Sequence, residues 1–163
     1  MKQLILVRHA KSDWPLEVSD FDRPLNKHRK SDCEVAADYF NSLHDLFNFH
    51  AVISTALRTR ETWETIERNL DSRPTNSFSE KMYQASVGDL LDVVQKQNKE
   101  NIILVGHNPG IAGLGTLLTG ERLESFPTLS IWHIKINGEW LDKPAKTLSR
   151  FTARVDENLK DID

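Results

Sequence analysis

Short apolar runs alternate with helix-patterned segments along the chain, and this alternation limits the folds that are open to it. The runs that predict strands lie at residues 4–7, 51–53, 101–105, 128–136 and 147–155. Apolar residues at helical spacing predict helices at residues 27–46, 57–70, 89–98 and 108–118. Strands that alternate with helices form a mainly parallel sheet with helices on both faces. We therefore predict an α/β fold, a three-layer α/β/α sandwich.

The composition fits one globular domain without a membrane segment. A length of 163 residues favours a single domain over residues 1–163, whose acidic tail, 156–163, is expected to fray. The net charge of −3 argues against nucleic acid as a partner. No apolar run approaches the roughly 20 residues of a membrane span. Cys33 is the only cysteine, which fits a reducing compartment, so we expect a cytoplasmic protein.

Two of the predicted strands end in the same way. The first runs into Arg8 and His9, and a later one ends at Val105 and is followed by Gly106 and His107. An open α/β sheet places its ligand crevice at the carboxyl ends of its strands. If the two strands are neighbours, both imidazoles face that crevice. A lone histidine is more often a packing residue than a catalyst, but the repeated placement favours a functional pair.

A third segment brings another arginine to the same edge of the sheet. Ser54 and Thr55 follow the strand at 51–53 and are expected to cap the next helix. Arg58 lies at the start of this helix, where free backbone N–H groups favour an anion, and we expect it to point inward. Arg60 is interpreted as a solvated helix charge.

Two arginines and two histidines at one sheet edge suit a tetrahedral dianion such as phosphate. Planar guanidinium groups can bind its oxygens through two hydrogen bonds at once. One imidazole can attack phosphorus while the other donors stabilise the equatorial oxygens. The chain has no spaced metal-ligand motif and no G-x-x-x-x-G-K-[ST] sequence, so neither a metal site nor a P-loop nucleotide kinase or NTPase is expected.

Several motifs resemble, in order, those of the histidine phosphatase superfamily, which has the phosphoglycerate-mutase-like fold, and of its SixA-like phosphohistidine phosphatase branch. Residues 8–14 resemble the RHG motif region, with Ala10 in place of the usual glycine, as in many SixA-like members. The other similar segments are Ser19–Leu25, Ala56–Thr62, Met82–Ala85 and Val105–Gly110. The resemblance spans residues 3 to about 118, and the C-terminal third matches only in general pattern.

The resemblance implies a role for each matching residue. His9 is then the nucleophile, which becomes phosphorylated on its ring during turnover. Arg8, Arg58 and His107 complete the phosphate pocket, and Ser12 matches a position that can contact phosphate. The resemblance implies no cofactor and no metal.

The general acid is the open part of the resemblance. Many members of the superfamily use a carboxylate between the second arginine and the second histidine. Glu80, three residues before Tyr83, resembles that pattern, but it is equally well interpreted as an exposed surface residue. Asp20, Asp22 and Arg23 either form the rim of the site or pair with one another on the surface.

The sequence therefore predicts a metal-independent phosphatase that works through a phosphohistidine enzyme intermediate. An alkoxide leaving group needs a proton in the transition state, so a site without a placed acid favours phosphohistidine or aryl phosphates over sugar phosphates. The expected partner is a protein that carries phosphohistidine, or a small phosphorylated molecule such as an aryl phosphate. A non-catalytic module that binds a phosphorylated ligand is the remaining alternative.

Overall fold

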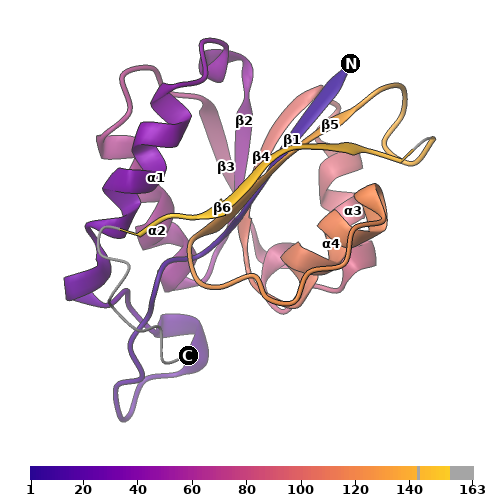
Figure 1. The fold of residues 1–163 in the computed structure, drawn as a ribbon. Helices are drawn as coiled ribbons and strands as arrows, with labels where there is room; N and C mark the ends of the chain where they lie inside the picture. Colours follow the sequence, from indigo (N-terminus) through magenta and orange to yellow (C-terminus); the bar gives the residue numbers. More distant parts are fainter. Residues whose placement is uncertain (143, 155–163) are drawn as a thin grey trace.

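The computed structural model of the chain describes residues 1–142 and 144–154 (Figure 1). Its centre is a six-stranded sheet with the order β3-β2-β4-β1-β5-β6. The strands are β1 (Lys2–Arg8), β2 (His50–Ser54), β3 (Thr75–Ser79), β4 (Asn101–Gly106), β5 (Ser130–Ile136) and β6 (Lys146–Thr152). Strands β1 to β4 pair in parallel, whereas β5 is antiparallel to both of its neighbours. The sequence-based prediction of a mainly parallel sheet is confirmed.

Strand β1 lies between β4 and β5, and its four apolar residues, 4–7, are fully buried. Val7 is paired with Val105 of β4 and Arg8 with Gly106. The two strands therefore end side by side, and the residues that follow them, His9 and His107, begin at the same edge of the sheet. The expectation that these strands are neighbours is confirmed.

Helices cover both faces of the sheet (Figure 1). The helices are α1 (Asp32–Asn41), α2 (Leu57–Arg68), α3 (Val87–Lys96) and α4 (Gly110–Thr119). Alternate side chains of β1 point to opposite faces, as a strand requires. Ile5 and Val7 pack in the cluster that includes Phe40 of α1 and Trp63 of α2. Leu4 and Leu6 pack in the cluster that contains residues of α3 and α4. The three-layer sandwich is thus present.

Four short 3₁₀ helices interrupt the loops. They are η1 (Asp20–Asp22), η2 (Lys27–Arg29), η3 (Leu46–Asn48) and η4 (Glu80–Met82). The helix predicted over 27–46 is therefore wrong at both ends, because α1 spans only its middle. The side chain of Asn26 accepts a hydrogen bond from the backbone N–H of His28 and so starts a separate turn. At the other end, the Leu43 N–H bonds to Phe40 in a tighter turn.

The remaining elements follow the prediction more closely. Ser86 caps α3 as expected, in a reciprocal pair of hydrogen bonds with Asp89. The predicted capping of α2 by Ser54 or Thr55 is wrong, since Ala56 holds that position without a side-chain bond. The predicted tail at 156–163 lies outside the described residues. Within the described residues, no helix has the length and apolar character needed to cross a membrane.

Candidate active site

A pocket of about 260 Å³ lies where β1 and β4 end. The side chains that line it are those of Arg8, His9, Ser12, Trp14, Arg23, Arg58, His107 and Asn108. The structure thus brings together five of the six residues named from the sequence, all except Glu80.

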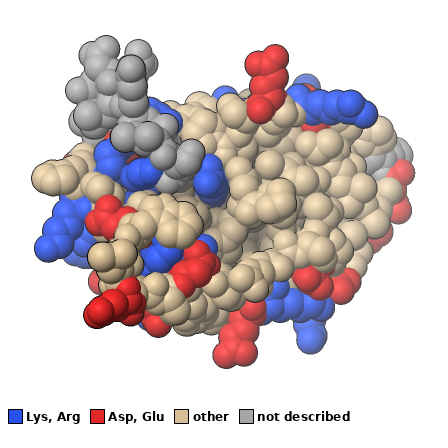
Figure 2. All heavy atoms as spheres, turned by 90° about the horizontal axis from the view of Figure 1, so that it is seen from below, with Lys and Arg blue, Asp and Glu red and all other residues tan. Residues whose placement is uncertain are grey.

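Figure 2 shows the molecule from below, with acidic and basic side chains close together on the left of this face and a broad uncharged area beside them.

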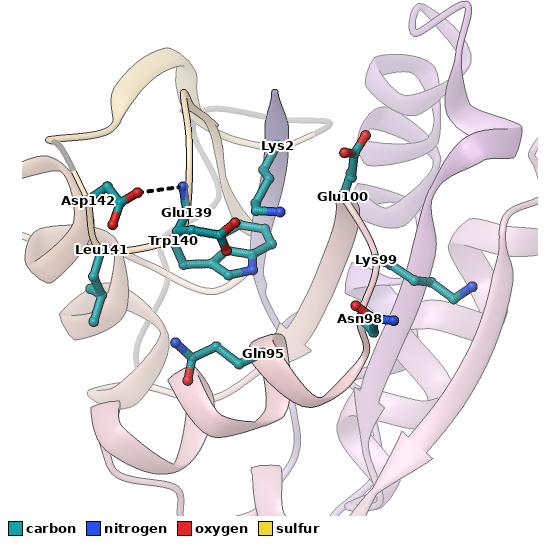
Figure 3. Close-up of a pocket in the computed structure, with 9 residues that line it drawn as sticks. All are labelled: Lys2, Gln95, Asn98, Lys99, Glu100, Glu139, Trp140, Leu141 and Asp142. Carbon is teal, nitrogen blue, oxygen red and sulfur yellow. Dashed lines mark hydrogen bonds between the residues drawn. The ribbon is translucent and has the colours of Figure 1, made fainter.

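A larger groove of about 590 Å³ lies at the opposite end of the sheet, next to the start of β1 (Figure 3). Lys2 lies beside Trp140 there, with its ammonium nitrogen 5.6 Å from the ring centre. Acidic and basic residues both line this groove, and it contains none of the residues that the sequence singled out. We therefore assign the candidate active site to the smaller pocket, on chemistry rather than on size.

His9 is held in one orientation by the loop that follows β1. Its Nδ1 lies 2.7 Å from the Ala10 carbonyl, and because a carbonyl only accepts, Nδ1 must carry the proton. The Ala10 N–H in turn donates to the hydroxyl of Thr62 on α2, at 3.0 Å. Burial lowers the pKa of His9 well below its usual value, and the charges of Arg8 and Arg58 lower it further, although the bond to Ala10 opposes this. His9 is therefore neutral at pH 7, with its lone pair on Nε2.

His107 faces His9 across the pocket, with the ring centres 5.4 Å apart. Its Nε2 lies 2.8 Å from the Ser54 hydroxyl, at the end of β2. Its Nδ1 is buried and has no hydrogen-bond partner among the described residues. Burial and the nearby charge of Arg58 lower the pKa of His107 to about 4, so this ring is neutral at pH 7 as well. A bound anion is the kind of partner that the buried Nδ1 lacks.

The loop between α4 and β5, residues 120–129, positions Arg8 and Asn108. The Phe126 carbonyl accepts hydrogen bonds from Arg8 Nη1 at 3.2 Å and from Asn108 Nδ2 at 2.8 Å. This loop precedes β5, the antiparallel neighbour of β1. The C-terminal third, which resembled the family only in general pattern, therefore helps to position the first arginine of the pocket.

Arg23 adds a third guanidinium to the pocket, and its side chain is 8% exposed. Its Nη2 donates to the Ser12 hydroxyl at 2.6 Å, and its guanidinium carbon lies 3.1 Å from the centre of the Trp14 ring. The sequence left Arg23 open between the rim of the site and a surface pair with aspartate. Both descriptions hold, because Nη1 also contacts Asp20 at 3.1 Å.

Asp20 connects the loop after β1 to the second arginine. Its carboxylate accepts hydrogen bonds from Arg23, from Arg58 and from the hydroxyl of Tyr83. Partial burial would raise the pKa of Asp20, but these hydrogen bonds and the charge of Arg58 lower it to about 2. The sequence did not predict this contact, because Asp20 and Arg58 are far apart in the chain.

Glu80 stands apart from the pocket. It is the first residue of η4, its side chain is exposed, and it is not among the residues that line the cavity. No Asp or Glu appears in that lining. Arg60 is exposed and bonds to the Thr55 carbonyl, as its interpretation as a surface charge requires. Within residues 1–142 and 144–154, no three His, Cys, Asp or Glu side chains are grouped to hold a metal ion.

Comparison with known proteins gives a consistent assignment. Residues 4–89 match the model of the histidine phosphatase superfamily, branch 1. An uncharacterized protein of Mycobacterium tuberculosis is 29% identical over 149 residues, which cover 83% of this chain and 90% of the relative. This family match supports phosphatase activity.

Two solved structures extend the similarity along the chain. An Agrobacterium tumefaciens protein assigned by name to the SixA phosphohistidine phosphatases is 25% identical, with a TM-score of 0.78 and coverage of 93% of this chain and 97% of that one. The protein histidine phosphatase SixA in complex with tungstate has the same fold, with a TM-score of 0.76, 17% identity and the same coverage. The family model alone matches more than half of the residues, and the chain therefore belongs to branch 1 of the histidine phosphatase superfamily, within which it is SixA-like.

Proposed function

We propose that the protein is a metal-independent phosphatase that removes the phosphoryl group from phosphohistidine of a protein, through a phosphorylated His9. The observation that carries the proposal is the pairing of His9 and His107, 5.4 Å apart and both neutral, in a pocket with three arginines. A neutral Nε2 is the form of histidine that can attack phosphorus. Arg8, Arg58 and His107 are proposed to bind the equatorial oxygens, with Ser12 at the edge of the same set.

The reaction needs two displacements at phosphorus. In the first, the Nε2 lone pair of His9 forms a bond to phosphorus while the P–N bond of the substrate breaks, and the leaving imidazole takes up a proton from solvent. In the second, water attacks phosphorus, the bond to Nε2 breaks, and inorganic phosphate and a proton are released. The arginines stabilise the charge on the transferred group in both steps.

The choice of substrate follows from the lining of the pocket. No carboxylic acid lines the cavity, and the nearby Asp20 stays ionised because its pKa is about 2. A sugar alkoxide leaves slowly without such an acid, whereas the imidazole of phosphohistidine accepts its proton from water. The same argument leaves aryl phosphates as alternative substrates, because a phenolate is a better leaving group than an alkoxide.

The rim of the pocket favours a protein as the carrier of the phosphoryl group. Trp14 lines the cavity and is still 71% exposed, and Leu16 and Val18 in the same loop are 91% and 39% exposed. A sugar phosphate is polar and gains little from aliphatic side chains such as Leu16 and Val18. An apolar face around a phosphorylated histidine would cover them, at a gain of about 25 cal/mol for each Å² buried.

A substrate panel tests the proposal. Wild type and His9→Asn are assayed with a phosphocarrier protein phosphorylated on histidine, with p-nitrophenyl phosphate and with glucose 6-phosphate, each with and without EDTA. We expect kcat/KM for the phosphoprotein to exceed that for the sugar phosphate by about a hundredfold or more. Rapid quench should trap an acid-labile phosphoenzyme that His9→Asn lacks, and EDTA should change nothing. Tight binding of the phosphoprotein without turnover would instead favour the non-catalytic module.

A further inference from the structure

Arg58 depends on a single residue for its placement. Both hydrogen bonds that its guanidinium donates to described residues go to Asp20: Nη1 donates to the backbone carbonyl at 2.7 Å, and Nη2 donates to the carboxylate at 3.1 Å. The Arg58 side chain is only 8% exposed. Solvent therefore contributes little to holding it, and the loop after β1 decides which way the guanidinium faces.

The adjacent edge of the same guanidinium, formed by Nε and Nη2, is the one that can face the pocket. Arg58 Nε is buried and has no hydrogen-bond partner among the described residues. A buried N–H without a partner is costly, so this edge is suited to a hydrogen-bond acceptor such as an oxygen of a phosphoryl group. Asp20 takes the edge formed by Nη1 and Nη2, which leaves Nε and the second proton of Nη2 for two oxygens of a phosphoryl group.

Asp20 is itself fixed from two further directions. Arg23 Nη1 donates to one carboxylate oxygen at 3.1 Å, and the hydroxyl of Tyr83 donates to the other. The Tyr83 ring packs edge-on against His107, with ring centres 5.7 Å apart, and against Phe21. The carboxylate is thereby linked to Arg23 directly and to His107 through the ring of Tyr83.

Arg23 is less dependent on Asp20 than Arg58 is. Apart from Asp20, it donates to the Asp13 carbonyl at 3.0 Å and to the Ser12 hydroxyl, and it stacks on Trp14. A change at Asp20 should therefore be felt first at Arg58.

We propose that Asp20 is a positioning residue, which holds the Arg58 guanidinium with its Nε edge turned toward the phosphoryl group and acts on the reaction through that arginine. The inference rests on the proposed function, in which Arg58 binds the transferred group. A carboxylate next to an anion site repels every anion that binds there. Its contribution must therefore be one of geometry, and it should be larger for the transition state than for bound phosphate.

Asp20→Asn separates these two effects, since the amide keeps the shape and loses the charge. We measure the Kd of inorganic phosphate and of vanadate, which takes the five-coordinate geometry of the transition state. Vanadate should bind about tenfold more weakly and kcat should fall about tenfold, while the Kd of phosphate should change less than about twofold. Asp22→Asn is the matched control, because Asp22 lies in the same turn, is exposed and bonds only to Ser19 among the described residues.

A double-mutant cycle with Arg58→Lys tests whether the effect passes through the arginine. Lysine keeps the charge and has no Nε edge to orient. In that background Asp20→Asn should change vanadate binding less than about twofold. Tyr83→Phe, which removes one bond to the carboxylate, should weaken vanadate about threefold in the wild-type background and not in Arg58→Lys. It provides the same comparison if Asp20→Asn lowers the Tm too far for assay.

The outcomes distinguish this inference from the proposed function. Equal weakening of phosphate and vanadate, unchanged vanadate binding, or an undiminished effect in Arg58→Lys would each overturn the role of Asp20, even with full wild-type turnover. A wild-type protein that binds both anions and hydrolyses no member of the panel would overturn the proposed function. The binding data would still decide the role of Asp20 in that case.

Discussion

Each imidazole of the pocket is held by the protein at one ring nitrogen. The Ala10 carbonyl fixes Nδ1 of His9, and the Ser54 hydroxyl contacts Nε2 of His107. The other nitrogen of each ring is left for a ligand. When Ser54 donates to Nε2, the neutral His107 ring carries its proton on Nδ1. This arrangement suits the proposed roles, in which His9 is the nucleophile and His107 is a hydrogen-bond donor.

The lowered pKa values of the two histidines predict how stability depends on pH. In the unfolded chain each ring has the usual histidine pKa of 6.5. In the folded chain burial lowers the pKa of both rings, that of His107 to about 4, so the unfolded chain binds protons more readily. The contribution of these two histidines to the free energy of unfolding is therefore fully present above pH 6.5, and it is lost as the pH falls toward 4. Urea unfolding of wild type and His107→Asn at pH 7, 6 and 5 checks this. The variant should lose less stability on acidification, and parallel curves would contradict the assignment.

The exposed position of Glu80 predicts a small effect of its removal. Glu80→Gln should lower kcat on phosphohistidine protein less than about twofold, because general acid catalysis contributes at least about a hundredfold where it operates. Steady-state kinetics with the phosphoprotein and with p-nitrophenyl phosphate measures this. A fall of a hundredfold or more would show that Glu80 moves into the site and acts as the acid.

At the residue scale, the sequence predicted the cluster but not its supports. Arg8, His9 and His107 were found because each follows an apolar strand, and strand ends converge in a parallel sheet. Asp20 was missed as a partner of Arg58 because nothing in a polar loop says which distant helix it reaches. Ser54 was assigned to a helix cap, its most frequent local use, and tertiary structure gave its hydroxyl to a histidine instead.

Among the elements, α4 has a close approach that depends on a glycine. A Cβ at Gly115 would lie 2.2 Å from the Trp132 ring of β5, whereas a Cβ at Gly88 of α3 would meet only the Ser86 hydroxyl, at 3.8 Å. Gly115→Ala should therefore destabilise the protein by about 1–3 kcal/mol. Gly88→Ala should stabilise it by up to about 1 kcal/mol. Urea unfolding of both variants measures the difference, and equal stability would mean that α4 shifts freely.

The loop that follows β1 offers a second test at this scale. Leu16→Ser with Val18→Ser should raise KM for the phosphoprotein about fivefold, because the loop loses apolar contact area, and should leave KM for p-nitrophenyl phosphate unchanged. Leu141→Ser is the control, since Leu141 is 55% exposed and lines the groove at the far end of the sheet (Figure 3). An equal effect of Leu141→Ser, or none from the loop, would remove the support for a protein substrate.

Elements without a strong apolar period were the least predictable. Strand β3, Thr75–Ser79, is a polar edge strand, and it is missing from the predicted strands because it has no apolar run. An Asn–Gly pair such as Asn137–Gly138 is typical of a two-residue hairpin. β5 and β6 do pair as antiparallel neighbours, but residues 137–145 connect them. Trp140 in this connection is 94% buried, so the chain folds back to cover it instead of turning at once.

For the whole molecule, the pocket connects segments that are far apart in sequence, so a ligand should stabilise the entire fold. Phosphate at a hundred times its Kd should add about 2.7 kcal/mol, which raises the Tm of a domain of this size by roughly 5–10 °C. Thermal unfolding of Arg58→Gln and Arg60→Gln, in phosphate and in chloride of equal ionic strength, checks the site. The first variant should lose most of the increase and the second should keep it. Equal shifts in both would place the anion elsewhere.

The central position of β1 also determines when the pocket can form during synthesis of the chain. Between the synthesis of His9 and that of His107, the ribosome must add β2, β3, β4 and three α-helices, and β5 comes later still. Before β4 and β5 are made, β1 has neither of its neighbours, and the proposed nucleophile has no second imidazole beside it. The proposed site can therefore assemble only after β5 has been synthesised, and a shorter polypeptide contains His9 without the rest of the pocket.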